Sequence, residues 1–313
     1  MKFDFSKYTI LTIGDVILDS YTFGTVDRIS PEAPVPVIKV QKTEFKLGGA
    51  ANVASNISAN KAQSILLGFK GNDVYGQNIE QLCQNENIIF KYINSAVPSI
   101  VKNRIIARGQ HIVRIDHEQA TFLSIEKTNQ LDKLFKEIIG NERIDGIIIQ
   151  DYNKGALPPA FIELIITQAN DNNIPTVVDP KFNNLTSFKN CSIFKPNQLE
   201  FNKAISHFDI NHSLTIYEKC SQLQKEIEFD KIYITLGAQG IYSFKLDKIF
   251  PTISSELVDI TGAGDSLVAC LILMHLHKLE EEEICINLNI IGSQVIQKIG
   301  TVSFNINSFF GEN

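Results

Sequence analysis

The sequence feature that most restricts the fold is a repeated alternation of short apolar runs with segments of helical spacing. The runs are YTILTIGD (8–15), SILLGFKG (64–71), DGIIIQDY (145–152), IPTVVDPK (174–181), CSIFKPN (191–197) and KIYITLG (231–237). Strands that alternate with helices form parallel sheets with crossover helices. Because the runs are almost continuously apolar, both faces of the sheet are expected to be covered. We therefore predict an α/β fold with a doubly wound, mostly parallel sheet flanked by helices.

Two segments depart from this alternation. Residues 16–40 and 98–117 have the character of extended strands with no helix between them. Pro31, Pro34 and Pro36 each remove a backbone donor, which confines the first of these segments to a sheet edge. We predict that the two segments form a small β-sheet, a lid, within one domain that spans residues 1–313.

Composition limits the kinds of partner. The net charge of −6 argues against broad binding to nucleic acids or anionic membranes, so any anion site must be local. The five cysteines are scattered without a C-x-x-C pair, which indicates reduced thiols and a cytoplasmic protein. The sequence contains no uninterrupted apolar run of about 18 residues, and we interpret its apolar start as a first strand instead of a signal peptide.

Polar residues follow five of the predicted strands, at the sheet edge where open α/β folds bind ligands. They are Gly14-Asp15, Asp151–Lys154, Asp179–Lys181, Lys195–Asn197 and Thr235–Gly237. A single instance can be a helix cap or a turn. Five together favour a ligand-binding edge.

The stretch DITGAGDSL (259–267) opens an apolar segment of helical character. It lacks the third glycine of the dinucleotide fingerprint, and the chain has no P-loop pattern, so a dehydrogenase is disfavoured. Glycines at a helix start let a phosphate approach the backbone amides. Asp265 is then either a carboxylate favoured by the helix dipole or a base that takes a proton in phosphoryl transfer. The motif alone leaves both interpretations open.

Four motifs in order resemble the signatures of the ribokinase-like (PfkB) carbohydrate kinases, and the resemblance covers essentially the whole chain. They are LGGAANVASNIS (47–58), KPNQLEF (195–201), TLGAQG (235–240) and GAGDS (262–266). The resemblance implies a ribokinase-like fold, a kinase activity, and ATP with Mg²⁺ as cofactors.

A narrower resemblance is to the D-glycero-β-D-manno-heptose 7-phosphate kinases of lipopolysaccharide-core precursor synthesis. It rests on GDVILDSY (14–21), RISPEAPVPVIKV (28–40), GGAANVA (48–54), DYNKGAL (151–157) and DPK (179–181). Bifunctional members carry an adenylyltransferase domain with an H-x-G-H motif after the kinase, and this sequence resembles the stand-alone form. It departs from the subfamily pattern at Gln150, where a small residue is usual, and at Ser266, where Thr is commoner; the first departure bears on local substrate contacts.

Residue by residue, the resemblance assigns the transfer step to the GAGDS motif. Asp265 would deprotonate the anomeric hydroxyl, and the amides of Gly262, Ala263 and Gly264 would bind the γ-phosphoryl group. Asp259 and Thr261 match positions near a monovalent-cation site, for K⁺, in some relatives.

The nucleotide side of the site is assigned in the same way. Asn197 and Glu200 would hold the Mg²⁺–phosphate assembly, largely through water. The other predicted nucleotide contacts are Thr235, Gly237 and Gly240 at the phosphates and Asn289 at the adenine pocket.

For the sugar, the matching positions are Asp15, Gly48, Gly49 and Asn52, with Asp151 and Lys154 from the DYNKGAL motif. A sugar phosphorylated at C7 needs a second cationic site, which Lys102 and Arg104 would supply, together with Arg114 or Lys154. The alternatives are that the glycines only mark a helix entry and that the cations form an ordinary solvated strand face.

The sequence therefore predicts ATP-dependent phosphorylation of heptose 7-phosphate at C1, giving the 1,7-bisphosphate. We expect the lid to close over the sugar, and the apolar edge VPVIKV (35–40) to pair in a homodimer. The alternatives are a ribokinase-type kinase for another sugar, sugar phosphate or nucleoside, and a nucleotide-binding regulatory protein without activity. No nucleic-acid or membrane partner is expected.

Overall fold

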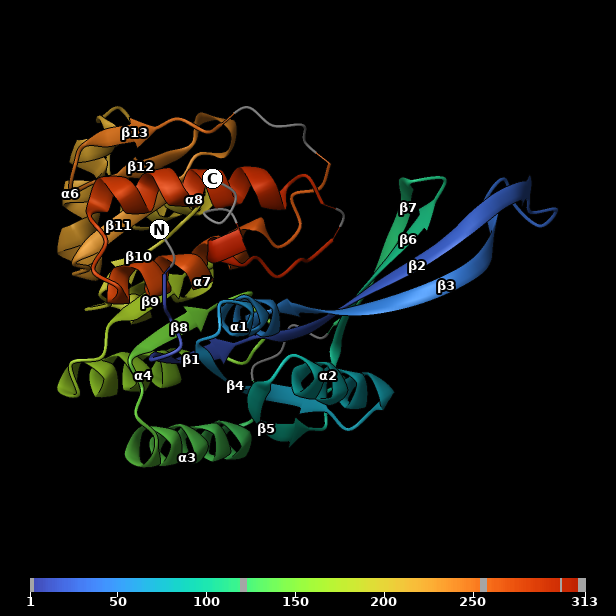
Figure 1. Cartoon of the computed structure of the whole chain (residues 1–313), viewed down its shortest axis with the longest axis horizontal. Helices are drawn as coiled ribbons and strands as arrows, with labels where there is room; N and C mark the ends of the chain where they lie inside the picture. The colour runs from blue at the N-terminus through green and yellow to red at the C-terminus, as the bar shows by residue number, and fades with distance from the viewer. Residues whose placement is uncertain (1–2, 119–122, 254–257, 299, 309–313) are drawn as a thin grey trace.

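The computed structural model describes residues 3–118, 123–253, 258–298 and 300–308, and within them the strands form two sheets (Figure 1). The larger sheet has the order β13-β12-β11-β10-β9-β8-β1-β4-β5. Its strands are β1 (Thr9–Gly14), β4 (Gln63–Gly71), β5 (Ile88–Ser95), β8 (Gly146–Gln150), β9 (Thr176–Asp179), β10 (Ile193–Phe194), β11 (Lys231–Thr235), β12 (Ile241–Ser243) and β13 (Lys248–Phe250). All pairings from β5 to β11 are parallel, and only β12 and β13 run antiparallel. The predicted doubly wound, mostly parallel sheet is confirmed.

Helices cover both faces of this sheet. They are α1 (Ala50–Ala59), α2 (Val74–Asn85), α3 (Ile125–Asn141), α4 (Pro159–Asp171), α5 (Gln198–His207), α6 (Ile216–Ile227), α7 (Ala263–Leu276) and α8 (Glu281–Val295), with short 3₁₀ turns at Phe182–Phe188, Gly237–Gln239 and Ile306–Ser308. Neighbouring residues of β1 face opposite layers, as strand geometry requires. Ile10 packs in the cluster that contains α7 and α8, whereas Leu11 packs in the cluster that contains α3 and α4.

Strand β1, an inner strand of the sheet, marks a reversal in the order in which the chain adds strands. It pairs with β4 on one side and with β8 on the other, so the chain first adds strands in one direction and then in the opposite one. Ligands of open α/β sheets bind beyond the carboxyl ends of the strands at such a point. The ends of β1 and β8 lie side by side there, because Gly14 is paired with Gln150.

The smaller sheet corresponds to the predicted lid, and it projects from the α/β body (Figure 1). It consists of β2 (Val16–Ile29), β3 (Pro36–Gly49), β6 (Ile100–Ala107) and β7 (Gln110–His117), in the order β3-β2-β6-β7. The predicted edge position is correct only for β3, which begins at Pro36; Pro31 and Pro34 lie in the turn before it, and β2, the first part of the predicted segment, is an inner strand. The sheet extends nine residues beyond the predicted boundary at residue 40, because β3 stays paired with β2 as far as Gly49.

Gly49 ends the lid strand and begins the connection to α1. Its φ of +56° lies in the left-handed region, and a Cβ there would be 2.5 Å from the carbonyl oxygen of Asp15. The glycine is therefore required where the lid enters the α/β body. Within the described residues, no helix has the length and apolar character needed to cross a bilayer.

Candidate active site

Asp265 lies in the first turn of α7 and is only 2% exposed. The residue before this helix, Gly262, has a φ of +77°, and a Cβ there would lie 2.8 Å from the side-chain nitrogen of Asn52. That nitrogen donates to Asp265 Oδ2 at 2.8 Å. The glycine thus leaves room for Asn52 to reach the carboxylate.

The other carboxylate oxygen of Asp265 has two donors from the end of β8 and the loop after it. Tyr152 Oη donates to Oδ1 at 2.7 Å, and Gln150 Nε2 donates to it at 3.2 Å. Burial raises the pKa of Asp265 to about 7, against the lowering effect of the bonds from Asn52 and Tyr152. A carboxylate with a pKa near neutrality suits a general base.

The start of α7 offers backbone donors beside this carboxylate. The first amides of a helix have no partner within it and favour anions. Ala263 N donates weakly to Ile260 O at 3.3 Å, but in the described part of the chain the amides of Gly262, Gly264 and Asp265 have no hydrogen-bond partner. Of the three predicted anion-binding amides, those of Gly262 and Gly264 are therefore free to donate to a ligand.

Asp15, at the end of β1, anchors the loop that carries Tyr152. Its carboxylate is fully buried and accepts the backbone amides of Tyr152 at 2.8 Å, Lys154 at 3.0 Å and Ala156 at 3.0 Å. The sequence suggested a sugar ligand at this position. The structure adds a positioning role, and the sugar contact of Asp15 remains a prediction.

The remaining sugar-site predictions fall around this loop. Asp151 is buried and accepts the side chain of Asn184 at 3.0 Å, and burial raises its pKa to about 6. Gly48 lies against Asp19, since a Cβ on Gly48 would be 2.7 Å from Asp19 Oδ2. A side chain at Gly48 would thus collide with Asp19 of the neighbouring lid strand β2, and one at Gly49 with the Asp15 carbonyl; contacts of the two glycines with a sugar remain predictions.

The predicted nucleotide side gathers at the ends of β10 and β11. Asn197 and Glu200 form a capping box at the start of α5, with both backbone-to-side-chain bonds at 2.9 Å. Thr235 pairs with Asn197 in a parallel bridge. These three predicted residues are thus neighbours.

The other nucleotide predictions differ in their surroundings. Gly240 has a φ of +101°, and a Cβ there would lie 2.0 Å from Phe250 O. Asn289 is buried and donates to Phe250 O at 2.8 Å and to Cys285 O at 3.1 Å, so its amide hydrogens are engaged within the protein. A Cβ on Gly237 would meet no atom beyond its chain neighbours within 4 Å, so this glycine faces open space. Contacts of these residues with a nucleotide remain predictions.

Sequence reasoning assigned no role to Lys181, which connects the two halves of the site. Its ammonium group pairs with Glu200 and lies 5.3 Å from the centre of the Tyr152 ring. Tyr152 in turn contacts Asp265. The signal available in the sequence was the position of Lys181 two residues after the end of β9, at the same sheet edge. A run of contacts therefore links the nucleotide-side Glu200 to Asp265.

The four predicted phosphate-binding cations have different surroundings. Arg104 is 7% exposed and pairs with Asp19 at 2.5 Å, so its charge is balanced inside the lid; its phosphate contact remains a prediction. Two more of these cations form ion pairs: Lys154 pairs with Glu118 at 2.6 Å, and Arg114 pairs with Asp116 at 2.8 Å. Lys102 has no ion pair among the described residues and lies 5.3 Å from the Tyr152 ring centre.

Asp259 and Thr261 lie together in the loop before α7. Asp259 Oδ1 accepts Thr261 N at 2.9 Å and Thr261 Oγ1 at 2.6 Å, and Oδ2 accepts Gly300 N at 2.8 Å. No group of three or more His, Cys, Asp or Glu side chains able to hold a metal occurs among the described residues. A Mg²⁺ ion at the nucleotide would therefore be held mostly by water and by the ligand phosphates, as is common for this ion.

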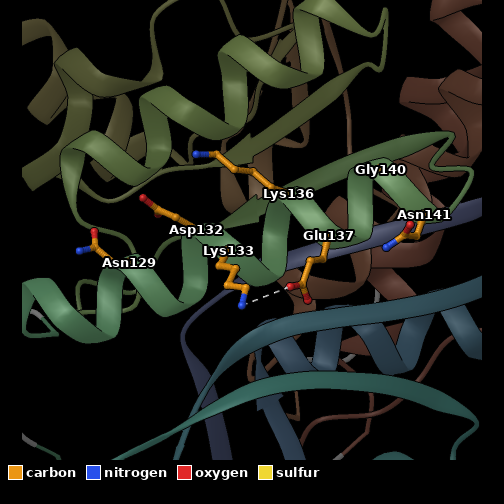
Figure 2. A pocket seen from close by; sticks show the side chains of 7 residues that line it. All are labelled: Asn129, Asp132, Lys133, Lys136, Glu137, Gly140 and Asn141. Carbon is orange, nitrogen blue, oxygen red and sulfur yellow. Dashed lines mark ion pairs between the residues drawn. The ribbon is translucent and has the colours of Figure 1, made fainter.

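Two cavities in the described part of the surface differ in their relation to the candidate site, and only one of them shares a residue with it. Figure 2 shows one of about 610 Å³ that is lined by α3 alone, with Lys133 and Glu137 3.9 Å apart. A ligand site needs polar groups that converge from several elements, so this hollow is not a candidate. A cavity of about 240 Å³ includes Asn52 in its lining but no other residue predicted for the site.

Comparison with known proteins agrees with this geometry. Residues 9–307 match the model of the pfkB family carbohydrate kinases. The bifunctional protein HldE of Helicobacter pylori (strain J99) is 35% identical over 297 residues, covering 93% of this chain and 63% of that protein. The bifunctional protein HldE of Hydrogenovibrio crunogenus is 36% identical, covering 95% and 61%. The chain thus spans less than two thirds of the length of these relatives.

Solved structures show the same fold at low sequence identity. Phosphofructokinase-2 from Escherichia coli, in complex with substrates and products, superimposes with a TM-score of 0.77 at 18% identity, covering 96% of both chains. Arabidopsis thaliana ribokinase, complexed with ribose and ATP, gives 0.70 at 17% identity, covering 97% of both. The fold is therefore ribokinase-like, and the match over residues 9–307 shows that the chain belongs to the PfkB family of carbohydrate kinases.

Proposed function

We propose that this carbohydrate kinase transfers the γ-phosphoryl group of ATP to the anomeric C1 hydroxyl of D-glycero-β-D-manno-heptose 7-phosphate. The observation that carries the proposal is the buried Asp265 carboxylate, with a pKa of about 7, beside free amides at the start of α7. The product would be the 1,7-bisphosphate, a precursor for lipopolysaccharide core. We propose that residues 1–313 form one kinase domain and that it acts in the cytoplasm.

In this proposal each group acts on a different part of the transfer. Asp265 takes the proton of the C1 hydroxyl as its oxygen attacks the γ-phosphorus, and the bond from the γ-phosphorus to the ADP oxygen breaks. The amides of Gly262 and Gly264 hydrogen-bond the transferring phosphoryl oxygens, whose charge they stabilise. Lid closure over the sugar would exclude water, which competes as an acceptor.

The cofactors of the proposal are ATP and Mg²⁺. When bound, Mg²⁺ would neutralise negative charge on the nucleotide phosphates. Asn197 and Glu200 would hold it through water, since the capping box and Lys181 already occupy part of their hydrogen-bonding capacity. Phosphofructokinase-2 from Escherichia coli has been solved in complex with potassium. By analogy, we propose K⁺ near Asp259 and Thr261.

The choice of sugar rests on the RISPEAPVPVIKV resemblance and on the bifunctional relatives, since that subfamily includes bifunctional kinase–adenylyltransferases. Lys102 is the cation proposed to bind the 7-phosphate, because it is not engaged in an ion pair within the described part of the lid. A kinase for another phosphorylated sugar remains the second candidate, since Lys102 would serve any sugar phosphate.

A substrate panel tests this choice. In a coupled ATP-consumption assay, we expect kcat/KM for heptose 7-phosphate to exceed that for ribose, fructose 6-phosphate and adenosine. Lys102→Met should lower kcat/KM for heptose 7-phosphate about 10- to 100-fold, because a hydrogen bond between charged groups is lost. It should change the value for unphosphorylated heptose little.

Lys39→Met is the matched control, because Lys39 is an exposed lysine of the same lid. Comparable turnover of phosphorylated and unphosphorylated heptose by the wild type would exclude the heptose-phosphate proposal. An equal effect of the two substitutions would exclude Lys102 as the phosphate ligand.

We also propose a homodimer formed through the lid. In the predicted edge VPVIKV, Val35 and Val40 are 51% and 57% exposed, and exposed strand edges favour association. Light scattering should give about twice the 35.0 kDa chain mass. The double variant Val35→Asp/Val40→Asp should be monomeric, whereas Val74→Asp, at an exposed site on α2, should remain dimeric. A monomeric wild type would contradict the proposal.

A further inference from the structure

The two oxygens of the Asp265 carboxylate have different surroundings. Oδ1 accepts both Tyr152 Oη at 2.7 Å and Gln150 Nε2 at 3.2 Å, whereas Oδ2 accepts only Asn52 Nδ2 at 2.8 Å among the described residues. An ionised carboxylate has about four lone-pair sites, two on each oxygen. The site left for a substrate hydroxyl is therefore on Oδ2.

We propose that Tyr152 is a positioning residue of the phosphoryl transfer: its hydroxyl, together with the Gln150 amide, holds Oδ1 so that Oδ2 faces the attacking hydroxyl. This inference rests on the proposed function of Asp265 as the base. It deepens that proposal by naming which oxygen takes the proton and which residue fixes it.

Tyr152 is itself held firmly, which a positioning residue requires. Its backbone amide donates to Asp15 Oδ2 at 2.8 Å, so the buried end of β1 fixes the start of the loop. Its ring contacts two lysines, with Lys102 and Lys181 each 5.3 Å from the ring centre. The ring therefore has partners on the lid and on the body, while the hydroxyl points at Asp265.

Gln150 supports the same oxygen from a second direction. Its side-chain nitrogen also donates to Asp179 Oδ2 at 2.7 Å, so one amide stands between two buried carboxylates. The departure from the subfamily pattern at residue 150 thus has a physical role. The glutamine keeps Asp179 and Asp265 apart and contributes a donor to each.

The charges around Asp265 determine how it responds to loss of the tyrosine hydroxyl. The groups that face it are Asn52 from α1, Asp19 from β2, Gln150 and Tyr152 from the end of β8, Asp179 from β9, and the lysines Lys102 and Lys181 beyond the Tyr152 ring. Burial and the carboxylates Asp179 and Asp19 raise the pKa of Asp265, and the Tyr152 bond lowers it. Without the hydroxyl the pKa rises further, so ionisation requires a higher pH.

Tyr152→Phe tests the inference, because it removes the hydroxyl and keeps the ring beside the lysines. At saturating substrates and pH 7 we expect kcat to fall about 10- to 100-fold, since a hydrogen bond to a charged group is lost, with little change in the KM for sugar. The acid limb of the kcat profile should shift to higher pH. Activity should therefore recover in part as the pH is raised.

Tyr242→Phe is the matched control. Tyr242 Oη donates to Asp247 Oδ1 at the same 2.7 Å, in the β12 region away from Asp265. We expect its kcat and pH profile to equal those of the wild type, whatever its effect on thermal stability. If both variants lose stability and neither changes the pH profile, Tyr152 is only structural and the inference is wrong.

A second measurement does not depend on the sugar. Carbon-13 NMR of aspartate-labelled, unliganded protein gives the pKa of the Asp265 carboxyl, with Asp265→Asn to assign the signal. We expect this pKa to be higher in Tyr152→Phe than in the wild type; an unchanged value overturns the inference. Failure of every sugar in the panel would instead refute the proposed function, and the NMR titration would still show whether the Tyr152 hydroxyl acts on the Asp265 carboxyl.

Discussion

Asp265→Asn is expected to reduce kcat by about 10²- to 10⁴-fold, because a general base contributes that much to the rate of a proton-coupled phosphoryl transfer. ATP should still bind to the variant. Asparagine preserves the shape of the side chain but cannot take the proton of the attacking hydroxyl. Tyr152 can still donate to its carbonyl oxygen, and Asn52 can accept from its amide once the Asn52 side chain rotates. Steady-state kinetics measures the first effect and calorimetric titration with ATP the second.

The wild-type pH profile provides an independent check on this assignment. Since burial raises the pKa of Asp265 to about 7, the base is protonated below that pH and kcat should fall there. The measurement is made with both substrates saturating, because a sugar phosphate titrates near pH 6 and affects KM. Substantial turnover by Asp265→Asn, or a flat profile between about pH 5 and pH 8, would exclude Asp265 as the base.

Six strands of the main sheet could be predicted from the sequence because their signal is local, whereas β5, β12 and β13 were not predicted. Each apolar run followed by Gly, Asp or Asn became a parallel strand, and Pro36 correctly marked an edge. The candidate site followed from the same reasoning, since residues after parallel strands meet at one edge of a sheet. Asn52 and Asp265 were named as functional from their motifs, and the structure brings them to within 2.8 Å.

The sequence could not predict contacts between residues that are far apart in the chain and that lie in no recognisable motif for such a contact. Tyr152 and Asp265 are 113 positions apart, and nothing in DYNKGAL marks the tyrosine as a partner of a carboxylate. Arg104 looked available because the alternation of β6 places it on the same strand face as Lys102. Its partner Asp19 is found only once β2 and β6 are aligned in register.

The second large effect is expected from Arg104→Met. The Arg104 and Asp19 side chains are 8% and 5% exposed, so removing the arginine leaves a buried carboxylate without its counter-charge. Breaking such a pair typically costs about 3–5 kcal/mol, whereas replacing both partners by apolar groups is often nearly neutral. We expect the free energy of unfolding, measured with urea, to fall by about 3–5 kcal/mol in Arg104→Met and to recover largely in Asp19→Leu/Arg104→Met.

Arg114→Met is the control for this experiment. The Arg114–Asp116 pair lies on the same lid, but its side chains are 55% and 25% exposed, and such pairs contribute about 0–1 kcal/mol. An equal cost for Arg104→Met and Arg114→Met would show that the buried pair does not stabilise the lid. The double variant also separates structure from recognition: if it folds but loses affinity for the sugar phosphate, the Arg104–Asp19 pair contributes to binding, and if it keeps that affinity, phosphate recognition does not need Arg104.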